Sequence, residues 1–261
     1  MKLLKILLAV ALFSTVVACQ DDEATKQMDV KFLLTDAPTS QNFQEVNIEV
    51  KEVYYSVSGE NWVQLPITQT VYNLLDLTNG LDTLLANIRL DAGTRINQMR
   101  LVLGTNNTIK LADGTIKTLE TPSAATSGLK VNIHQSISTE SGYAVMIDFD
   151  ADRSIVEKGN GDYSLKPVIR AYIVQNTSYI DGYIIPPFVQ MNVFVVSGLD
   201  TVSTVSDVTL NNYFKLHGLN SGTYSLQFRE ISTNIILKDT AINIIGGTNV
   251  RLGEIVFPVI N

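Results

Sequence analysis

Cysteine, tryptophan and histidine are nearly missing from this chain. Among 261 residues there are one Cys, one Trp and two His. A lone Cys forms no internal disulfide, and neither His134 nor His217 stands in an H-x-x-E or H-E-x-x-H arrangement, so the zinc peptidase signature is absent. The sequence also contains no G-x-S-x-G elbow and no Gly-rich phosphate loop. Signatures of serine hydrolysis, zinc hydrolysis and nucleotide binding are therefore all lacking.

Charge is also scarce. Charged residues make up 17% of the chain, against a usual fraction of about 25%. With 26 acidic and 19 basic residues the net charge is -7, which argues against nucleic acid as a partner because binding it depends on neutralising phosphates. Hydrophobic residues reach 45%, enough for a large core and unlike a disordered polyanion.

The N-terminus has the pattern of an export signal. Residues 1–18 read MKLLKILLAVALFSTVVA, with two lysines ahead of an apolar run at 6–17. That run is too short to cross about 30 Å of hydrocarbon as a helix, so we expect a signal peptide. The following Val16-Val17-Ala18-Cys19 resembles a bacterial lipobox, which implies that Cys19 becomes the acylated N-terminus, carrying palmitate or related chains that anchor it in a membrane. The alternative is a plain secretory peptide with an incidental Cys.

An acidic cluster follows the lipobox. Gln20-Asp21-Asp22-Glu23 resembles the export tag that carries lipoproteins of Bacteroidetes-type bacteria to the outer leaflet of the outer membrane. Residues 19–27 would then be a lipidated flexible tether. We expect a lipid-anchored outer-membrane protein exposed at the cell surface. A periplasm-facing protein, with the cluster as a mere spacer, is the alternative.

Beyond residue 28 the hydrophobic pattern has a period of two, as in Val30, Phe32 and Leu34, which predicts half-buried strands. The pattern slips phase across Lys51-Glu52, which indicates a β-bulge. Asp113-Gly114 between two alternating runs predicts a hairpin. A spacing of three to four among the leucines at 74–85 allows one short helix near 81–88. Residues 28–176 are predicted to form a β-sandwich domain.

A second unit is predicted for residues 177–261. Its strands are expected at 190–196, 213–216, 223–228, 240–245 and 250–257, with Pro186-Pro187 at a strand edge or bend. Short strands separated by Gly and Asn turns favour a second β-sandwich. The expected fold is therefore all-β, with two β-sandwich domains after a lipoprotein signal peptide and at most one short helix.

The N-terminal unit resembles domain of unknown function 4382, a family of bacterial and archaeal lipoproteins and secreted proteins. The motifs that carry the resemblance are Thr35-Asp36-Ala37-Pro38, Trp62, Leu74-Leu75-Asp76-Leu77, Gly93-Thr94, Met99-Arg100-Leu101-Val102-Leu103, Thr121-Pro122-Ser123, Ser127-Gly128-Leu129-Lys130, and the stretch from Asp148 to Ile169. The family has no established activity, so the resemblance implies architecture and little function.

The C-terminal unit is similar to prealbumin-like, carboxypeptidase-regulatory-type sandwiches. The motifs are the run from Tyr213 to Leu219, the run from Ser221 to Leu226, and Gly246-Gly247 before the closing strand. The resemblance implies a domain that accompanies another activity and is not itself a catalyst.

Asp148, Asp150 and Asp152 form the densest acidic feature. They alternate with apolar residues, so on a strand they project from one face and repel one another unless a cation intervenes. We therefore predict a calcium site there, with Asp36 and Asp76 as further candidate ligands. The alternative is that Arg153, Lys130 or Lys166 neutralises the row.

Aromatic residues flank the turn at 58–61. Alternation places Tyr55 inward and Tyr54 outward. Tyr54 and Trp62 are predicted to contact a ligand by stacking on sugar rings, against the alternative that Trp62 belongs to the core. Tyr179, Tyr183 and Phe188 are expected to pack between the domains.

These patterns favour a non-catalytic binding or structural module at the outer membrane that captures an extracellular glycan or protein. No cofactor other than calcium is expected. Two alternatives stay open. One is a glycan-active hydrolase with unrecognised carboxylates, and the other is an assembly subunit that pairs through strand edges.

Overall fold

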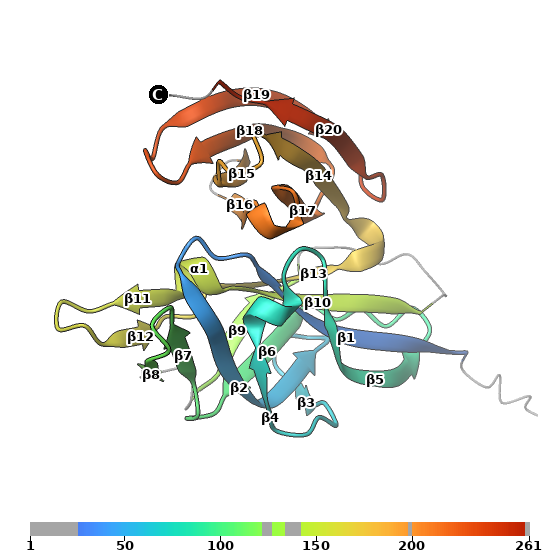
Figure 1. Ribbon diagram of the computed structural model, residues 1–261. Coiled ribbons are helices and arrows are strands. Elements are labelled where there is room, and N and C mark those ends of the chain that lie inside the picture. Colours follow the sequence, from blue (N-terminus) through green and yellow to red (C-terminus); the bar gives the residue numbers. More distant parts are fainter. Residues whose placement is uncertain (1–25, 122–126, 134–141, 198–199, 259–261) are drawn as a thin grey trace, which may run out of the picture.

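The computed structural model describes residues 26–121, 127–133, 142–197 and 200–258. Cys19, the predicted signal peptide, nearly all of the tether and His134 lie outside these residues. Figure 1 shows two layered β units, one above the other, joined near β13 and β14. None of the helices in the described ranges is long and apolar enough to cross a membrane.

Within its described residues, the N-terminal unit contains thirteen strands and one short α-helix. The strands are β1 (Gln27–Ala37), β2 (Phe43–Ser56), β3 (Trp62–Gln64), β4 (Thr70–Asn73), β5 (Thr83–Asp91), β6 (Gln98–Leu103), β7 (Thr108–Leu111), β8 (Ile116–Glu120), β9 (Leu129–Asn132), β10 (Tyr143–Asp150), β11 (Ile155–Glu157), β12 (Tyr163–Leu165) and β13 (Ile169–Ile173). Helix α1 (Ala151–Ser154) follows β10, and 3-10 helices η1 (Leu74–Leu77) and η2 (Val174–Asn176) complete the unit.

These strands form two sheets around one core. The smaller sheet has the order β13-β10-β1-β5, and the larger runs β11-β12-β8-β7-β2-β6-β9, with β3 and β4 both paired to β2. The apolar residues predicted to point inward, such as Val30, Phe32 and Leu34, are buried between the sheets. Strands β1 and β10 pair in parallel, so two segments far apart in the sequence lie side by side at the centre of the smaller sheet.

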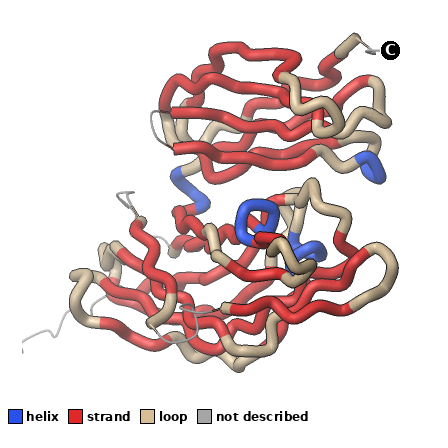
Figure 2. The backbone as a smooth tube through the Cα atoms, turned by 90° about the vertical axis from the view of Figure 1, so that its left-hand side faces the viewer, coloured by secondary structure: helices blue, strands red, loops and turns tan. Residues whose placement is uncertain are grey.

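The C-terminal unit packs a three-stranded sheet on a four-stranded one. Its strands are β14 (Ser178–Ile185), β15 (Met191–Ser197), β16 (Asp200–Val205), β17 (Tyr213–Leu219), β18 (Gly222–Glu230), β19 (Ile236–Ile244) and β20 (Val250–Val256), with a 3-10 helix η3 (Val208–Leu210) before β17. The sheet orders are β17-β14-β20 and β16-β15-β18-β19. A separate apolar cluster that includes Phe214 and Phe228 fills the space between them. Figure 2 shows the helical turns gathered around the junction of the two units.

The all-β prediction is confirmed, and so are two local features. The β2–β6 pairing shifts register between Val50 and Glu52, where the sequence predicts a bulge. Strands β7 and β8 pair antiparallel around Asp113-Gly114, and Gly114 adopts a φ of +85° that other residues disfavour.

The helix predicted near 81–88 is wrong. Residues 83–91 form β5, an edge strand, and Leu81 and Leu84 are 63% and 54% exposed. The helical spacing arose because Leu74 and Leu77 are buried in η1. The leucines of two adjacent elements, η1 and β5, therefore have the spacing of a single helix in the sequence.

Candidate functional site

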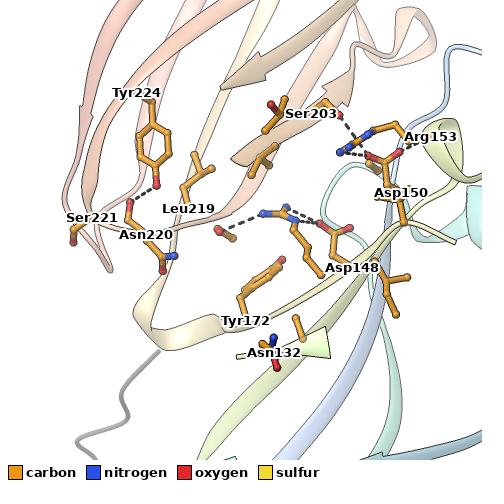
Figure 3. Close-up of a pocket in the computed structure, with 18 residues that line it drawn as sticks. Asn132, Asp148, Asp150, Arg153, Tyr172, Ser203, Leu219, Asn220, Ser221 and Tyr224 are labelled. Atoms are coloured by element: carbon orange, nitrogen blue, oxygen red, sulfur yellow. Dashed lines mark hydrogen bonds and ion pairs between the residues drawn. The ribbon is translucent and has the colours of Figure 1, made fainter. Parts of the chain in front are cut away.

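A cleft with a volume of about 520 Å³ lies between the two units. Figure 3 shows that Asp148, Asp150 and Tyr172 face it from the N-terminal unit, while Ser203, Leu219 and Tyr224 face it from the C-terminal unit. Concave sites between domains commonly bind ligands. The charged side chains that line this cleft therefore determine which ligand or reaction it could support.

Asp148 is held by an ion pair at the floor of this cleft. Its Oδ2 accepts from Arg170 Nη2 at 2.5 Å and from Nε at 2.7 Å. The same guanidinium donates to the backbone carbonyls of His217 at 2.6 Å and Gly218 at 3.3 Å, both in β17. Because Arg170 belongs to β13, this network joins the two units. Asp148 is only 4% exposed. Its negative charge holds Arg170 in the contact that connects the two units.

Asp150 ends β10 and caps helix α1. Its Oδ1 accepts from the Arg153 backbone N–H at 2.9 Å, and its Oδ2 lies 3.8 Å from Arg153 Nη1. Ser203 Oγ of the C-terminal unit lies 3.5 Å from the same Oδ2. Burial raises the pKa of Asp150 to about 6, and the negative charges of Asp148 and Asp152 add to this effect. Asp150 is thus a carboxylate partly buried from solvent, and it stabilises the start of helix α1.

Asp152 turns away from the other two. Helix α1 begins directly after Asp150, so the alternation of the strand stops before Asp152. Its Oδ1 accepts from Thr39 Oγ1 at 2.9 Å and from the backbone N–H and side-chain hydroxyl of Ser40 at 2.7 Å each. It stabilises the loop after β1. The prediction that all three aspartates project from one face is therefore wrong.

The two further candidate ligands also lie elsewhere. Asp36 is buried on the core side of β1 and accepts from the Ala151 N–H at 2.9 Å; burial raises its pKa well above the ordinary value. Asp76 lies in η1. Within the described residues, no three Asp, Glu, His or Cys side chains gather as a metal-binding group. Calcium binding by this chain stays a prediction that this geometry does not favour.

Tyr172 and His217 complete the joint between the units. The Tyr172 hydroxyl hydrogen-bonds His217 Nδ1, and the Tyr172 ring packs against Gly218, where a Cβ would lie 2.5 Å from a ring carbon. Burial lowers the pKa of His217 to about 4, so this imidazole is neutral at physiological pH. Its environment suits a fixed contact between domains more than proton transfer.

Tyr54 and Trp62 come together on the outer side of the larger sheet, as part of a different site. Tyr54 lies opposite Arg100 of β6, and Arg100 lies opposite Lys130 of β9. Trp62 lies opposite Ser56, one step along the same face. Arg100 Cζ is 4.1 Å from the Tyr54 ring centroid and 5.0 Å from that of Trp62, and Lys130 Nζ is 5.6 Å from the Trp62 centroid. We call Tyr54, Trp62, Arg100 and Lys130 the aromatic–cation face.

Polar groups surround this face. Tyr54 donates to Glu52 Oε2 at 2.7 Å, a hydrogen bond that raises the pKa of the Tyr54 hydroxyl. Gln98 Nε2 donates to Asn132 Oδ1 at 2.7 Å. Tyr54 and Trp62 are half-buried, whereas Lys130 and Asn132 are exposed. Tyr55 is buried on the opposite side, as predicted. The face therefore combines aromatic rings and amides with the exposed Lys130 and the half-buried Arg100.

Arg100 and Arg170 were not singled out from the sequence, and Lys130 was considered only as a counter-ion of the aspartate row, whereas it lies over the Trp62 ring and Arg170 pairs with Asp148. The period-two pattern does place Arg100 and Lys130 on the outward side of their strands, but it carries no information about which strands are neighbours. The predicted packing of aromatic residues between the domains is only partly right. Tyr179 lies beside Lys215 near the joint, whereas Tyr183 and Phe188 are 40% and 71% exposed.

Residues 27–167 match the family described as domain of unknown function DUF4382. Because the match spans more than half of the chain, this protein belongs to that family. No curated protein matches the sequence.

Several solved structures align with most of the chain at low similarity. The Bacillus anthracis TIE protein has 8% identity and a TM-score of 0.22, with 88% of this chain and 34% of that chain covered. The chain thus spans about a third of the TIE protein's length. BcpA, the major pilin subunit of Bacillus cereus, has 12% identity and a TM-score of 0.22, with 87% and 69% covered. The fimbrial anchor protein Mfa2 from Porphyromonas gingivalis has 10% identity and a TM-score of 0.20, with 81% and 82% covered. At these scores the similarity assigns no function.

Proposed function

We propose that this protein is a non-catalytic glycan-binding module, tethered to the outer membrane through acylated Cys19 and exposed at the cell surface. The aromatic–cation face is its contact surface. The observation that carries the proposal is the convergence of Trp62 and Tyr54 on one outward sheet face, surrounded by amide and charged side chains.

This composition suits sugars. A pyranose presents apolar C–H faces and equatorial hydroxyls, so it is bound well by an aromatic ring beside hydrogen-bonding groups. Gln64 and Asn132 are exposed and Gln98 is half-buried, all on the same side of the strands as Tyr54. A sheet face of this kind supports capture of a polymer along its length.

The interdomain cleft supports a role without turnover. Its two carboxylates are engaged in structural contacts, because Asp148 is paired with Arg170 and Asp150 caps α1. A glycoside hydrolase needs one free carboxylate and one protonated acid on either side of the scissile bond. Neither Asp148 nor Asp150 is free of such contacts.

The test is a glycan array and titration calorimetry with the chain from residue 20 onward, comparing wild type, Trp62→Ala and Val63→Ala. Val63 lies on the same strand, opposite Tyr55 rather than on the aromatic–cation face, and is 48% exposed, which makes it a matched control. We expect Trp62→Ala to weaken binding about tenfold, equivalent to about 1.4 kcal/mol, and Val63→Ala to leave it unchanged.

Two outcomes would contradict the proposal. One is an equal loss in both variants, which would remove the aromatic–cation face from the binding site. The other is turnover of a bound glycan that disappears when one carboxylate is changed, which would make the protein an enzyme. A panel of hydrolase assays on the same preparations covers the second outcome.

A further inference from the structure

We infer that the glycan is acidic, and that Arg100 and Lys130 recognise its anionic groups. This inference rests on the proposed function and adds the chemical class of the ligand. Its starting point is a pair of cations for which the described part of the protein supplies no counter-ion.

The two cations face each other across neighbouring strands. Arg100 and Lys130 are directly paired in the antiparallel β6–β9 ladder, where opposed side chains begin about 4.5–5.5 Å apart. Like charges in this position destabilise a sheet. Among the described residues, neither has a carboxylate within 4.0 Å. An anion from outside the protein would relieve this repulsion.

The acid beside Tyr54 on strand β2, Glu52, is already engaged. Glu52 accepts from the Tyr54 hydroxyl at 2.7 Å and lies 3.9 Å from Lys51 Nζ. Arg100 Nε is buried and has no hydrogen-bond partner among the residues that the structure describes. The guanidinium lies against the rings of Tyr54 and Trp62, and no carboxylate of the described residues pairs with it.

That placement prepares the cations for a ligand. Stacking on aromatic rings restricts a long side chain before binding, so less conformational entropy is lost when an anion arrives. The planar guanidinium fork matches a carboxylate, or a sulfate, in geometry. With the Trp62 ring beside it, the face combines a surface for a sugar ring with donors for an acid on that ring.

The charge of the whole chain narrows the choice of occupant. At a net charge of -7 the protein as a whole repels polyanions. The two unmatched cations therefore favour a polyanion that also contains rings able to stack on Tyr54 and Trp62. An acidic polysaccharide meets both conditions. Its charge comes from carboxylates or from sulfates, and the ligands tested must separate these sources.

The experiment compares polygalacturonate with its methyl ester, and dextran sulfate with dextran, by calorimetry at low and at raised salt. Each pair keeps the sugar backbone and changes the charge. We expect at least tenfold tighter binding of one charged polymer than of its neutral counterpart, with an affinity that falls as salt increases. The pair that responds identifies the carboxylate or the sulfate.

Three variants locate the effect. Arg100→Gln and Lys130→Gln should each weaken binding of the charged polymer about tenfold and reduce its salt dependence, while Lys166→Gln, an exposed lysine on the loop between β12 and β13, should behave as wild type. Melting curves should show that both site variants are folded, because relief of the like-charge pair offsets the loss of a contact with the aromatic rings.

The inference is overturned if charged and neutral polymers bind equally, or if Lys166→Gln weakens binding as much as Arg100→Gln does. Equal binding that is still lost in Trp62→Ala leaves the proposed glycan-binding function standing and removes only the acidic ligand. If no polymer on the array or in the titrations binds, both fail.

Discussion

Asp150 shows how a single buried carboxylate ties stability to pH. Burial raises its folded-state pKa to about 6 from the ordinary value of 3.8. As pH rises from about 4 to about 6 the unfolded chain ionises first, so the contribution of Asp150 to stability is lost over this range. Asparagine keeps an oxygen that can cap α1 and removes the ionisation.

We therefore expect Asp150→Asn to match wild type near pH 4 and to be more stable above pH 6, by about 2 kcal/mol. Urea unfolding of both proteins at pH 4 and pH 7 measures this. If the difference in unfolding free energy between the two proteins were the same at pH 4 and pH 7, burial between the units would not perturb the ionisation of Asp150.

His217 acts in the opposite direction over an overlapping range. Its pKa is lowered by burial from 6.5 to about 4, so its contribution to stability is present above pH 6.5 and lost as pH falls toward 4. The groups that face it are Tyr172, Asp148, Arg170 and Lys215.

His217→Gln should remove an acid destabilisation of about 2–3 kcal/mol between pH 6.5 and pH 4. Unfolding of the Asp150→Asn and Asp150→Asn/His217→Gln proteins across this range isolates the histidine, because the opposing titration of Asp150 is then absent. A pH slope that survives in the double variant would assign the effect to another group.

Strand β13 contacts the second unit through Arg170 and Tyr172, and Arg170 makes the charged contact. Arg170 pairs with Asp148 within its own sheet and donates to the β17 backbone. Arg170→Gln would leave Asp148 buried without a partner. Because 31% of the Arg170 side chain is exposed, we expect a loss near 2–3 kcal/mol, at or below the lower end of the range for breaking a buried pair.

The double variant Asp148→Asn/Arg170→Gln is the control for this prediction. It should recover part of the loss, since no charge remains buried alone. Denaturant unfolding measures stability, and small-angle scattering reports whether the two units separate. A double variant as unstable as the single one would show that lost contacts to β17, rather than an uncompensated Asp148, dominate.

At the scale of elements, the sequence predicts what depends on neighbours along the chain. The bulge in β2 and the Asp113-Gly114 turn were correctly predicted because their signals are local. The helix near 81–88 failed because buried leucines of η1 and β5 share a helical spacing without sharing an element. A capping aspartate also ended β10 earlier than alternation implied.

The candidate sites depend on which strands are neighbours, and this is why the sequence revealed only part of them. Tyr54 and Trp62 flank one turn, so their proximity was predictable. Arg100 and Lys130 are brought to them by β6 and β9. Likewise Arg170 reaches His217 only because the two units pack together. Long-range pairing of this kind leaves no local pattern to detect.

At the scale of the whole molecule, the proposed anchor leads to a direct test. Cys19 is the sole thiol in the chain, so Cys19→Ala should abolish palmitate incorporation in cells and release the protein from the membrane fraction. Metabolic labelling of wild type and variant measures this. Equal labelling of the two would refute acylation at Cys19.

The parallel pairing of β1 with β10 also determines the order of events during synthesis. Val30 pairs with Tyr143, so the pairing of β1 with β10 cannot form until more than a hundred residues after Val30 have left the ribosome. Contacts this distant in sequence slow folding. In the export that we propose for this protein, slow pairing of β1 with β10 would keep the nascent chain unfolded while it is translocated, without a chaperone to delay its folding.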